Sequence, residues 1–324
     1  MKSIVLIQAY FGKFNRLFPV QLHTMAENPE ITFMLFTDQD VSDYKLPVNV
    51  VMHKTTFEKI RSLIGDKVVD IEDFVLNSPY KLVDYKPMFG KVFEDYIQSY
   101  DYWGFYDPDI LFGKITHFVT EELLTTYDKM FTLGHFQIFK NTSEINELYK
   151  IEHNVEKTFL YRDVFKFETM LQFDEWGGKK GRGLSYALHR LDFPQYDELV
   201  FADIYADEYN FQIVDRQDQF HAYKRFYYDE GLLFGEDSNG VKTEFMYIHF
   251  QKRNMTIGIT DFTSFEIEPT RLLSLGAQSD VMVKRSDKKK FNFEKNKRKI
   301  EHRTKMFFSV SYWKRRVHVL LQKG

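Results

Sequence analysis

The sequence contains no cysteine among its 324 residues. Disulfide bonds, thiolate catalysis and cysteine-ligated zinc are therefore excluded, and the composition suits a reducing compartment such as the cytosol. No stretch approaches the roughly 20 continuous apolar residues that a membrane-spanning helix requires. The apolar run at residues 4–7 is too short for a signal peptide and ends at the polar Gln8, so we expect a strand there.

Acidic residues are scarce at the C-terminal end of the chain. Residues 284–324 contain 15 Lys or Arg but only 3 Asp or Glu, which gives a local charge of +12. The whole chain carries −3, so residues 1–283 carry −15. An acidic body with a basic tail favours an anionic surface as partner, and the charge of the body argues against nucleic acid. We therefore predict a domain at residues 1–283 and a basic, amphipathic tail at residues 284–324.

The composition is otherwise typical of a globular protein with a full core. Hydrophobic residues make up 44% of the chain, which is long enough for one large domain with a smaller appendage or for two modest domains. Aromatic residues reach 17%, with 33 Phe and 20 Tyr. Most of them must lie in the core, although Tyr and Trp beside a polar cleft also stack on sugar rings.

Strand and helix patterns alternate along the first 110 or so residues. Short β-branched or apolar runs predict strands, and apolar residues recurring at spacings of three and four predict helices. This alternation is typical of a doubly wound α/β fold with a mostly parallel sheet, which binds ligands beyond the carboxyl ends of its strands. The predicted strands are residues 4–7, 31–36, 48–52 and 102–106, and the predicted helices are residues 14–25, 57–64 and 88–97.

The second half of the chain is less regular. Residues 286–299 are charged and poorly periodic, which predicts a linker, and residues 306–321 form an apolar and basic terminal segment. Strands are predicted at residues 129–133, 136–139, 211–214, 220–226 and 245–250, and helices at residues 143–149 and 184–191.

The run from Tyr102 to Gly113 reads as a short buried strand that ends in two carboxylates, Asp107 and Asp109. Pro108 between them removes a backbone donor, so the hydrogen-bond ladder stops there. Two hard oxygen ligands at a strand end form a seat for Mg²⁺ or Mn²⁺, which takes its remaining ligands from phosphates and water. An ordinary Asp-Pro-Asp turn is the alternative, since both residue types favour turns.

Two segments in the first half are candidates for nucleotide contacts. Gly12, after the first strand, permits close approach of a base or ribose, and Asp38, after the second, can accept hydrogen bonds from them. The segment 79–87 carries two Lys around an Asp and can reach a diphosphate, or it is a solvated helix start with Pro87 in its first turn. The residues predicted to bind the nucleotide are Tyr10, Phe11, Gly12, Asp38, Lys81, Asp84 and Lys86.

An acidic loop in the second half suits a sugar pocket. Asp174 and Glu175 precede Trp176 and two glycines, so one acid can hold sugar hydroxyls while one serves as a general base. We predict Asp174 and Glu175 as the catalytic candidates and Trp176 as part of the donor pocket. An acidic loop with one anchoring Trp is the alternative.

A late histidine can complete the metal site. His249 ends a predicted strand, and a neutral imidazole can supply a third ligand to a transition metal such as Mn²⁺. Lys252 or Arg253, which follow, can neutralise a leaving diphosphate, where charge builds in the transition state. A structural histidine at a strand end is the alternative.

The order of these segments resembles the GT-A class of glycosyltransferases across nearly all of residues 1–283. In metal-dependent members a strand-end pocket binds the nucleoside, an Asp-x-Asp motif binds metal and diphosphate, an acidic loop lines the sugar pocket, and a late His closes the metal site. The layout is similar to the glycogenin and lipopolysaccharide-galactosyltransferase type, whose His-Phe motif with a following Lys matches His249-Phe250 and Lys252. Gln251, Arg253 and Asn254 depart from the Gly and Pro of that type, which leaves the donor sugar and the stereochemistry open.

Several stretches also look like a bacterial family whose members sit in capsule and O-antigen gene clusters and are assigned only as sugar transferases. The resemblance implies a Rossmann-like GT-A fold. It also implies hexosyl transfer from a nucleotide donor, expected to be a UDP-sugar, with Mn²⁺ or Mg²⁺ held by Asp107, Asp109 and His249. The acceptor would be a lipid-linked saccharide or a polysaccharide. A nucleotidyltransferase and a non-catalytic sugar-nucleotide-binding subunit are the alternatives. The stretches that carry this resemblance are residues 33–38, 84–87, 103–113 and 173–176.

The basic tail carries aromatic and aliphatic residues between its cations. Such a segment suits the interface of an anionic bilayer, where each cation contributes about 1 kcal/mol. We therefore expect a cytoplasmic protein that attaches reversibly to the inner face of the cytoplasmic membrane. A solvated tail and a helix docked on the acidic body are the alternatives.

Overall fold

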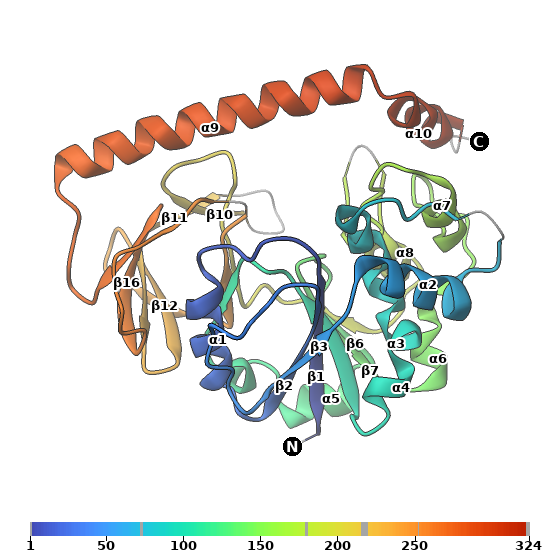
Figure 1. Cartoon of the computed structure of the whole chain (residues 1–324), viewed down its shortest axis with the longest axis horizontal. Coiled ribbons are helices and arrows are strands. Elements are labelled where there is room, and N and C mark those ends of the chain that lie inside the picture. Colours follow the sequence, from blue (N-terminus) through green and yellow to red (C-terminus); the bar gives the residue numbers. More distant parts are fainter. Residues whose placement is uncertain (1, 72–73, 179–180, 215–219, 252, 322–324) are drawn as a thin grey trace.

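A computed structural model describes residues 2–71, 74–178, 181–214, 220–251 and 253–321. Its centre is a seven-stranded sheet formed, in spatial order, by β3 (Val50–Lys54), β2 (Ile31–Thr37), β1 (Ile4–Tyr10), β4 (Tyr102–Tyr106), β7 (Phe136–Lys140), β6 (Lys129–Met130) and β8 (Gln195–Tyr196) (Figure 1). Strands β1 to β4 are parallel, whereas β7 runs antiparallel to β4 and β6. The predicted α/β class with a mostly parallel sheet is confirmed.

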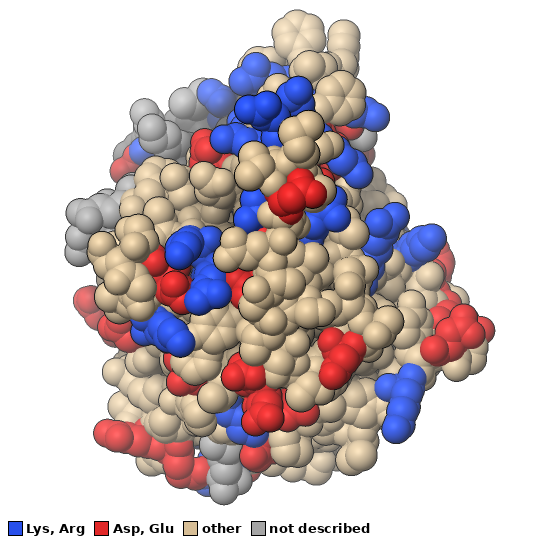
Figure 2. Space-filling model, turned by 90° about the vertical axis from the view of Figure 1, so that its left-hand side faces the viewer, with Lys and Arg blue, Asp and Glu red and all other residues tan. Residues whose placement is uncertain are grey.

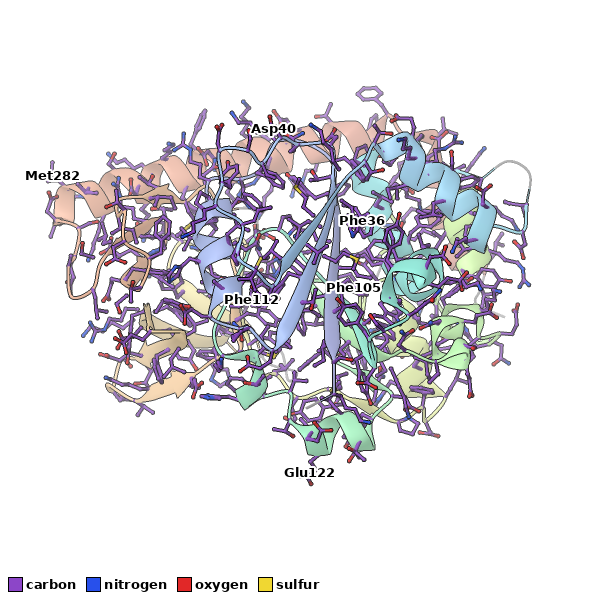
Figure 3. The ribbon with its side chains drawn as sticks, turned by 60° about the horizontal axis from the view of Figure 1, so that its bottom comes forward. Phe36, Asp40, Phe105, Phe112, Glu122 and Met282 are labelled. Carbon is purple, nitrogen blue, oxygen red and sulfur yellow. The ribbon has the colours of Figure 1, made fainter. Side chains whose placement is uncertain are left out.

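Helices cover both faces of this sheet because its strands are apolar on both sides. Leu6 points into a core cluster that includes α1 (Phe18–Ala26), and its neighbour Val5 points into a second cluster on the other face. Figure 3 shows Phe36 and Phe105 on the second face and Phe112 on the face of α1. The second face is covered by α2 (Phe57–Val68), the 3₁₀ helix η1 (Pro79–Met88), α3 (Phe89–Val92), α4 (Glu94–Ile97), α7 (Tyr161–Lys166) and α8 (Leu184–Arg190).

Two predicted elements, a helix and a strand, are longer than the observed ones because the backbone leaves the regular conformation before their predicted ends. The single helix predicted at residues 88–97 is wrong, since Phe93 leaves the helical conformation and divides α3 from α4. The strand predicted at 129–133 stops at Met130, because Phe131 adopts a φ of 67°. The remaining short helices are η2 (Ile115–His117), α5 (Glu121–Thr126), α6 (Ser143–Asn146) and η3 (Leu148–Lys150).

A largely antiparallel sheet packs beside the central one. Two of its strands, β10 and the first part of β11, were predicted at residues 211–214 and 220–226, whereas β12, β16 and β17 were not predicted from the sequence. In spatial order the sheet contains β13 (Lys242–Glu244), β12 (Leu232–Asp237), β11 (Phe220–Asp229), β16 (Ser264–Glu268), β17 (Arg271–Ser274) and β15 (Thr256–Ile257), and β10 (Phe211–Val214) pairs with β11.

A small three-stranded sheet joins distant parts of the chain. It consists of β5 (Ile110–Phe112), β14 (Tyr247–His249) and β9 (Ala202–Asp203). In its register His249 lies opposite Ile110 on one side and opposite Asp203 on the other. The residue after the Asp107–Asp109 turn is thereby fixed beside the late histidine.

The chain ends in two helices, α9 (Val281–Phe307) and α10 (Val310–Leu321). The linker predicted at residues 286–299 is wrong, because this segment lies inside α9. The α9 sequence has no Gly or Pro and is rich in Lys and Arg, which are strong helix formers. Its periodicity is weak because, among its described side chains, only Phe291 is buried. Figure 1 shows α9 passing above the upper edge of the sheet, where β1 ends, and α10 lying near α7.

No helix within the described residues combines the length and the apolar character needed to cross a bilayer.

Candidate metal centre

Asp107 and Asp109 lie at the junction of β4 and β5, at the carboxyl end of the parallel strands. Main-chain hydrogen bonds fix both ends of this junction: the Asp107 N–H donates to the carbonyl of His135 (2.9 Å), and the Phe250 N–H donates to the carbonyl of Asp109 (3.0 Å). The Asn15 amide also donates to the Pro108 carbonyl at 2.9 Å. The junction contains the Asp-Pro-Asp turn that the sequence predicted as the alternative to a metal site. That turn directs both carboxylates toward His249.

His249 faces these two carboxylates. Its Nε2 lies 3.3 Å from Oδ1 of Asp109 and 3.9 Å from Oδ2 of Asp107. One ligand atom from each of the three residues lies within 4.8 Å of the others, which is a spacing that a single metal ion can bridge. The sequence prediction that these three residues come together therefore agrees with the geometry.

Asp203 orients the imidazole of His249. Its Oδ1 lies 2.8 Å from His249 Nδ1 and also accepts a hydrogen bond from the Gln251 amide at 2.7 Å. A carboxylate on one imidazole nitrogen directs the other nitrogen to a metal. Burial lowers the pKa of His249, but Asp109 and Asp203 outweigh it and hold that pKa well above its ordinary value. The centre is therefore built to accommodate positive charge.

A second imidazole, that of His135, lies beside the first. The two ring centroids are 4.5 Å apart, and the Nδ1 of His135 is 2.9 Å from the Tyr247 hydroxyl. The side chain is only 3% exposed, yet its Nε2 has no hydrogen-bond partner within the described residues and lies 3.8 Å from Oδ2 of Asp203. Burial lowers the pKa of His135 to about 4, so the ring is neutral near pH 7.

These donors fit a divalent metal. His135, Asp203 and His249 form a second group with ligand atoms within 4.8 Å, adjoining the group of Asp107, Asp109 and His249. Carboxylate oxygens suit Mg²⁺ and Mn²⁺, while imidazole nitrogens suit transition metals. The buried Nε2 of His135, which has no hydrogen-bond partner within the described residues and lies 3.8 Å from Asp203, is a further reason to expect a cation here.

Lys86 connects the metal carboxylates to the acidic loop. Its Nζ lies 2.6 Å from Oδ1 of Asp107, 3.2 Å from Oδ2 of Asp174 and 2.8 Å from the carbonyl of Gly134. Burial lowers the pKa of the amine, but the charges of Asp107 and Asp174 raise it by more than burial lowers it. The pKa therefore lies above its ordinary value, and Lys86 stays charged. A fixed cation is thus placed between the two acidic groups.

The acidic loop presents two carboxyls whose affinity for protons is raised. Burial raises the pKa of Asp174 well above its ordinary value, although Lys86 opposes the shift. Burial also raises the pKa of Glu175, opposed first by a hydrogen bond of 3.1 Å from the Gly134 N–H. Gly134 is required here, because a Cβ at this position would lie 2.7 Å from Oδ2 of Asp174.

Lys81 and Asp84 have a different place from the one predicted. They are buried and form an ion pair of 2.8 Å with each other. Asp84 accepts the N–H groups of Leu171 (2.7 Å) and Phe173 (3.0 Å), and Lys81 donates to the Thr169 carbonyl (3.2 Å). The pair therefore holds the loop that delivers Asp174, and its contacts are with protein groups.

The residues predicted to contact the nucleoside lie in different surroundings. Burial raises the pKa of Tyr10, and the charge of Asp109 raises it further. Gly12 has a φ of 134° and open space where a Cβ would stand. Phe11 packs on Phe57 in the core, with ring centroids 5.9 Å apart. Asp38 is exposed and accepts a hydrogen bond from the Gln39 amide at 2.7 Å.

The remaining residues predicted to contact the sugar or the diphosphate are Trp176, Arg253 and Lys252. Trp176 is half-buried with its ring 5.3 Å from that of Tyr186. Arg253, the alternative cation, is buried and donates to main-chain carbonyls, including those of Tyr209 (2.7 Å) and Glu208 (2.5 Å), so it holds a loop. Lys252 lies outside the described residues.

A protein-family model matches residues 6–275, and its description is a family of unknown function (DUF6625). The chain belongs to this family. No curated protein matches the chain. The part that matches DUF6625 includes every residue of the candidate centre, and it ends before α9 begins. The two terminal helices therefore lie beyond the matched region.

Sequence reasoning missed Asp203 and His135. Asp203 belongs to a strand of two residues, which is too short to show a periodicity, and only its pairing with β14 brings it to His249. His135 precedes β7, and the signal that was available is its place between a glycine and a predicted strand.

Proposed function

We propose that this DUF6625 protein is a metal-dependent glycosyltransferase. It moves a sugar from a nucleoside diphosphate, expected to be UDP, to a saccharide acceptor. The observation that carries the proposal is the cluster of Asp107, Asp109 and His249, whose ligand atoms lie within 4.8 Å of one another. The cluster stands at the carboxyl end of a mostly parallel sheet, where folds of this class bind ligands.

The cluster explains how a diphosphate leaving group would be handled. Asp107, Asp109 and His249 would hold Mn²⁺ or Mg²⁺, and such an ion stabilises the charge that develops on a departing diphosphate. Asp203 keeps the Nε2 of His249 directed at the two carboxylates. Lys86, 2.6 Å from Asp107, adds a fixed positive charge on the side of the acidic loop.

The acidic loop supplies groups for the sugar and the acceptor. In the transfer the bond between the anomeric carbon and the diphosphate oxygen breaks, and the acceptor oxygen bonds to that carbon and loses its proton. Asp174 or Glu175 takes up this proton, and burial raises the pKa of both carboxyls toward the range that suits a general base. Trp176, in the same loop, offers an aromatic face for a sugar ring.

The nucleoside would lie beside the end of β1. Gly12 leaves open space there, and Tyr10 ends β1 at the same edge of the sheet at which β4 delivers Asp107, so a base and ribose in this position would continue into a diphosphate at the metal. A lipid-linked saccharide, which grows at a membrane surface, is the acceptor class we favour.

A thermal-shift screen of UDP-, GDP- and dTDP-sugars with and without Mn²⁺ tests the proposal. A ligand present at 100 times its dissociation constant stabilises the folded state by about 2.7 kcal/mol. For a chain of this size that is a rise of roughly 5 °C in Tm. We expect the rise with one nucleotide class, only when Mn²⁺ is present, together with release of the nucleoside diphosphate in the presence of acceptor.

Two variants make the screen specific. Asp109→Asn removes one ligand charge and is expected to abolish both the metal-dependent rise and the turnover. Glu122→Gln is the matched control, because Glu122 is exposed on α5. Figure 3 shows it at the opposite end of the molecule from Asp40, which follows the carboxyl end of β2. An Asp109→Asn protein with unchanged metal-dependent turnover would refute the assignment, and pyrophosphate as the product would instead identify a nucleotidyltransferase.

A further inference from the structure

The last helix presents its apolar side to solvent. Val310, Trp313, Val317 and Leu321 recur at spacings of three and four, so they form one stripe along α10. All four are exposed, from 51% for Trp313 to 77% for Leu321. A surface helix of a globular protein normally turns such a stripe toward the core. We call these four residues the α10 stripe. The α10 stripe faces solvent instead of the core.

Within the described residues, α10 contacts the body of the protein at His318, which flanks the stripe. His318 Nε2 lies 3.4 Å from Oδ1 of Asp163 in α7, and its ring is 6.2 Å from the ring of Phe159 and 5.3 Å from that of Phe167. This contact at His318 holds α10 against α7, and the four residues of the α10 stripe remain exposed.

Two phenylalanines at the end of α9 enlarge the apolar surface. Phe307 is 68% exposed and Phe308 is 78% exposed. The indole of Trp313 donates to the Phe307 carbonyl at 3.2 Å, which ties the two helices together at this point. Contiguous exposed apolar surface of this kind marks an interaction site.

The charge around the stripe selects the partner. Residues 302–324 contain no Asp or Glu and 6 Lys or Arg, and Lys314 and Arg316 are exposed next to the stripe. Figure 2 shows Lys and Arg gathered toward the top of the molecule, the side along which α9 runs, with acidic side chains more frequent lower down. An apolar stripe bordered by cations, with a Trp on it, is the pattern of helices that lie in the interface of an anionic bilayer.

A second copy of this chain fits the surface less well. Self-association through the α10 stripe would bring two sets of cations together without an acidic residue between them. An anionic polymer would satisfy the cations but would leave the four apolar side chains in water. We propose that the α10 stripe, with Phe307 and Phe308, docks this protein on the surface of an anionic lipid bilayer.

Vesicle sedimentation of the full chain tests this proposal without any measurement of enzymatic activity. We expect binding to vesicles of phosphatidylglycerol and phosphatidylcholine, no binding to vesicles of phosphatidylcholine alone, and release at high salt. The double variant Trp313→Glu with Val317→Glu should bind at least tenfold more weakly. Val48→Glu with Val241→Glu is the matched control, because it adds the same charge at two exposed apolar positions outside the tail, and its binding should be unchanged.

Fluorescence identifies the surface that enters the lipid. The chain has 3 Trp, of which Trp103 is buried and Trp176 half-buried. We expect the emission to shift to shorter wavelength on anionic vesicles, and we expect this shift to disappear in Trp313→Phe while sedimentation persists. Circular dichroism and Tm, unchanged in all variants, establish that they fold.

Three results would overturn the proposal. One is a stripe variant that folds and still binds anionic vesicles like the unmodified protein. Another is the absence of any vesicle binding. The third is a concentration-dependent dimer that the stripe variant converts to a monomer, which would assign the surface to a second copy. None of these results bears on the metal centre, so the two proposals fail separately.

Discussion

Burial of Lys129 makes the stability of this protein depend on pH. Lys129 is fully buried in β6, where its Nζ donates to the Phe131 carbonyl (2.5 Å) and the Ser185 hydroxyl (3.0 Å). Burial lowers its pKa from 10.5 to about 7, although the charge of Asp197 opposes the shift. Between those pH values the unfolded chain holds one more proton than the folded chain, so stability rises with pH across this window.

The size of the effect follows from the two pKa values. One proton corresponds to a slope of about 1.4 kcal/mol per pH unit, and the whole window corresponds to a penalty of about 5 kcal/mol below pH 7. Lys129→Met removes the penalty but leaves the Phe131 carbonyl and the Ser185 hydroxyl without their donor, at about 1–3 kcal/mol each. The net stability at pH 6 therefore changes by less than the penalty, whereas the pH slope disappears.

Urea unfolding at pH 6, 7, 8 and 9 measures this slope. We expect the unmodified protein to gain stability relative to Lys129→Met by about 1 kcal/mol per pH unit above pH 7. Lys59→Met is the matched control, because Lys59 is exposed on α2, and its pH dependence should follow that of the unmodified protein. Parallel pH profiles for the unmodified protein and Lys129→Met would show that burial does not neutralise this amine.

Two further predictions concern the candidate centre. Asp203→Asn should weaken Mn²⁺ binding by about 10- to 100-fold in calorimetric titration, since the carboxylate that orients His249 loses its charge; affinity equal to that of Glu122→Gln would contradict this role. Gly134→Ala should destabilise the fold by about 1–3 kcal/mol in urea unfolding, because the new Cβ would stand 2.7 Å from Asp174. Gly178→Ala is its control, since a Cβ there has open space and the change should stay within about 0.5 kcal/mol; equal losses in the two variants would refute the clash.

The sequence predicted those parts of the fold and site that depend on local pattern. Strands β1, β2 and β4 are mostly apolar, which is typical of parallel strands buried on both faces. Asp107 and Asp109 could be predicted as metal ligands because two carboxylates directly follow the apolar strand β4. His249 was visible because it ends a strand.

Contacts between distant segments could not be predicted in this way. Lys81 and Asp84 were expected to reach a ligand, but they satisfy each other and the loop at residues 169–173, and nothing in their spacing indicates that they are buried. The helix α9 was mistaken for a linker because its charged residues hide its periodicity. Its one buried side chain among those described, Phe291, contacts the ring of Tyr209 from another part of the chain.

The length of α9 has a mechanical consequence. A helix of 27 residues extends about 40 Å, and this one is fastened near both ends. Asp287 pairs with Arg271 of β17 at 2.5 Å and 2.9 Å, and α10 is held to α7 through His318 and Asp163. Together, α9 and α10 thus connect the antiparallel sheet, through β17, to α7 on the second face of the central sheet. A hinge-like separation of the antiparallel sheet from α7 would therefore have to break the ion pairs at one end of this connection.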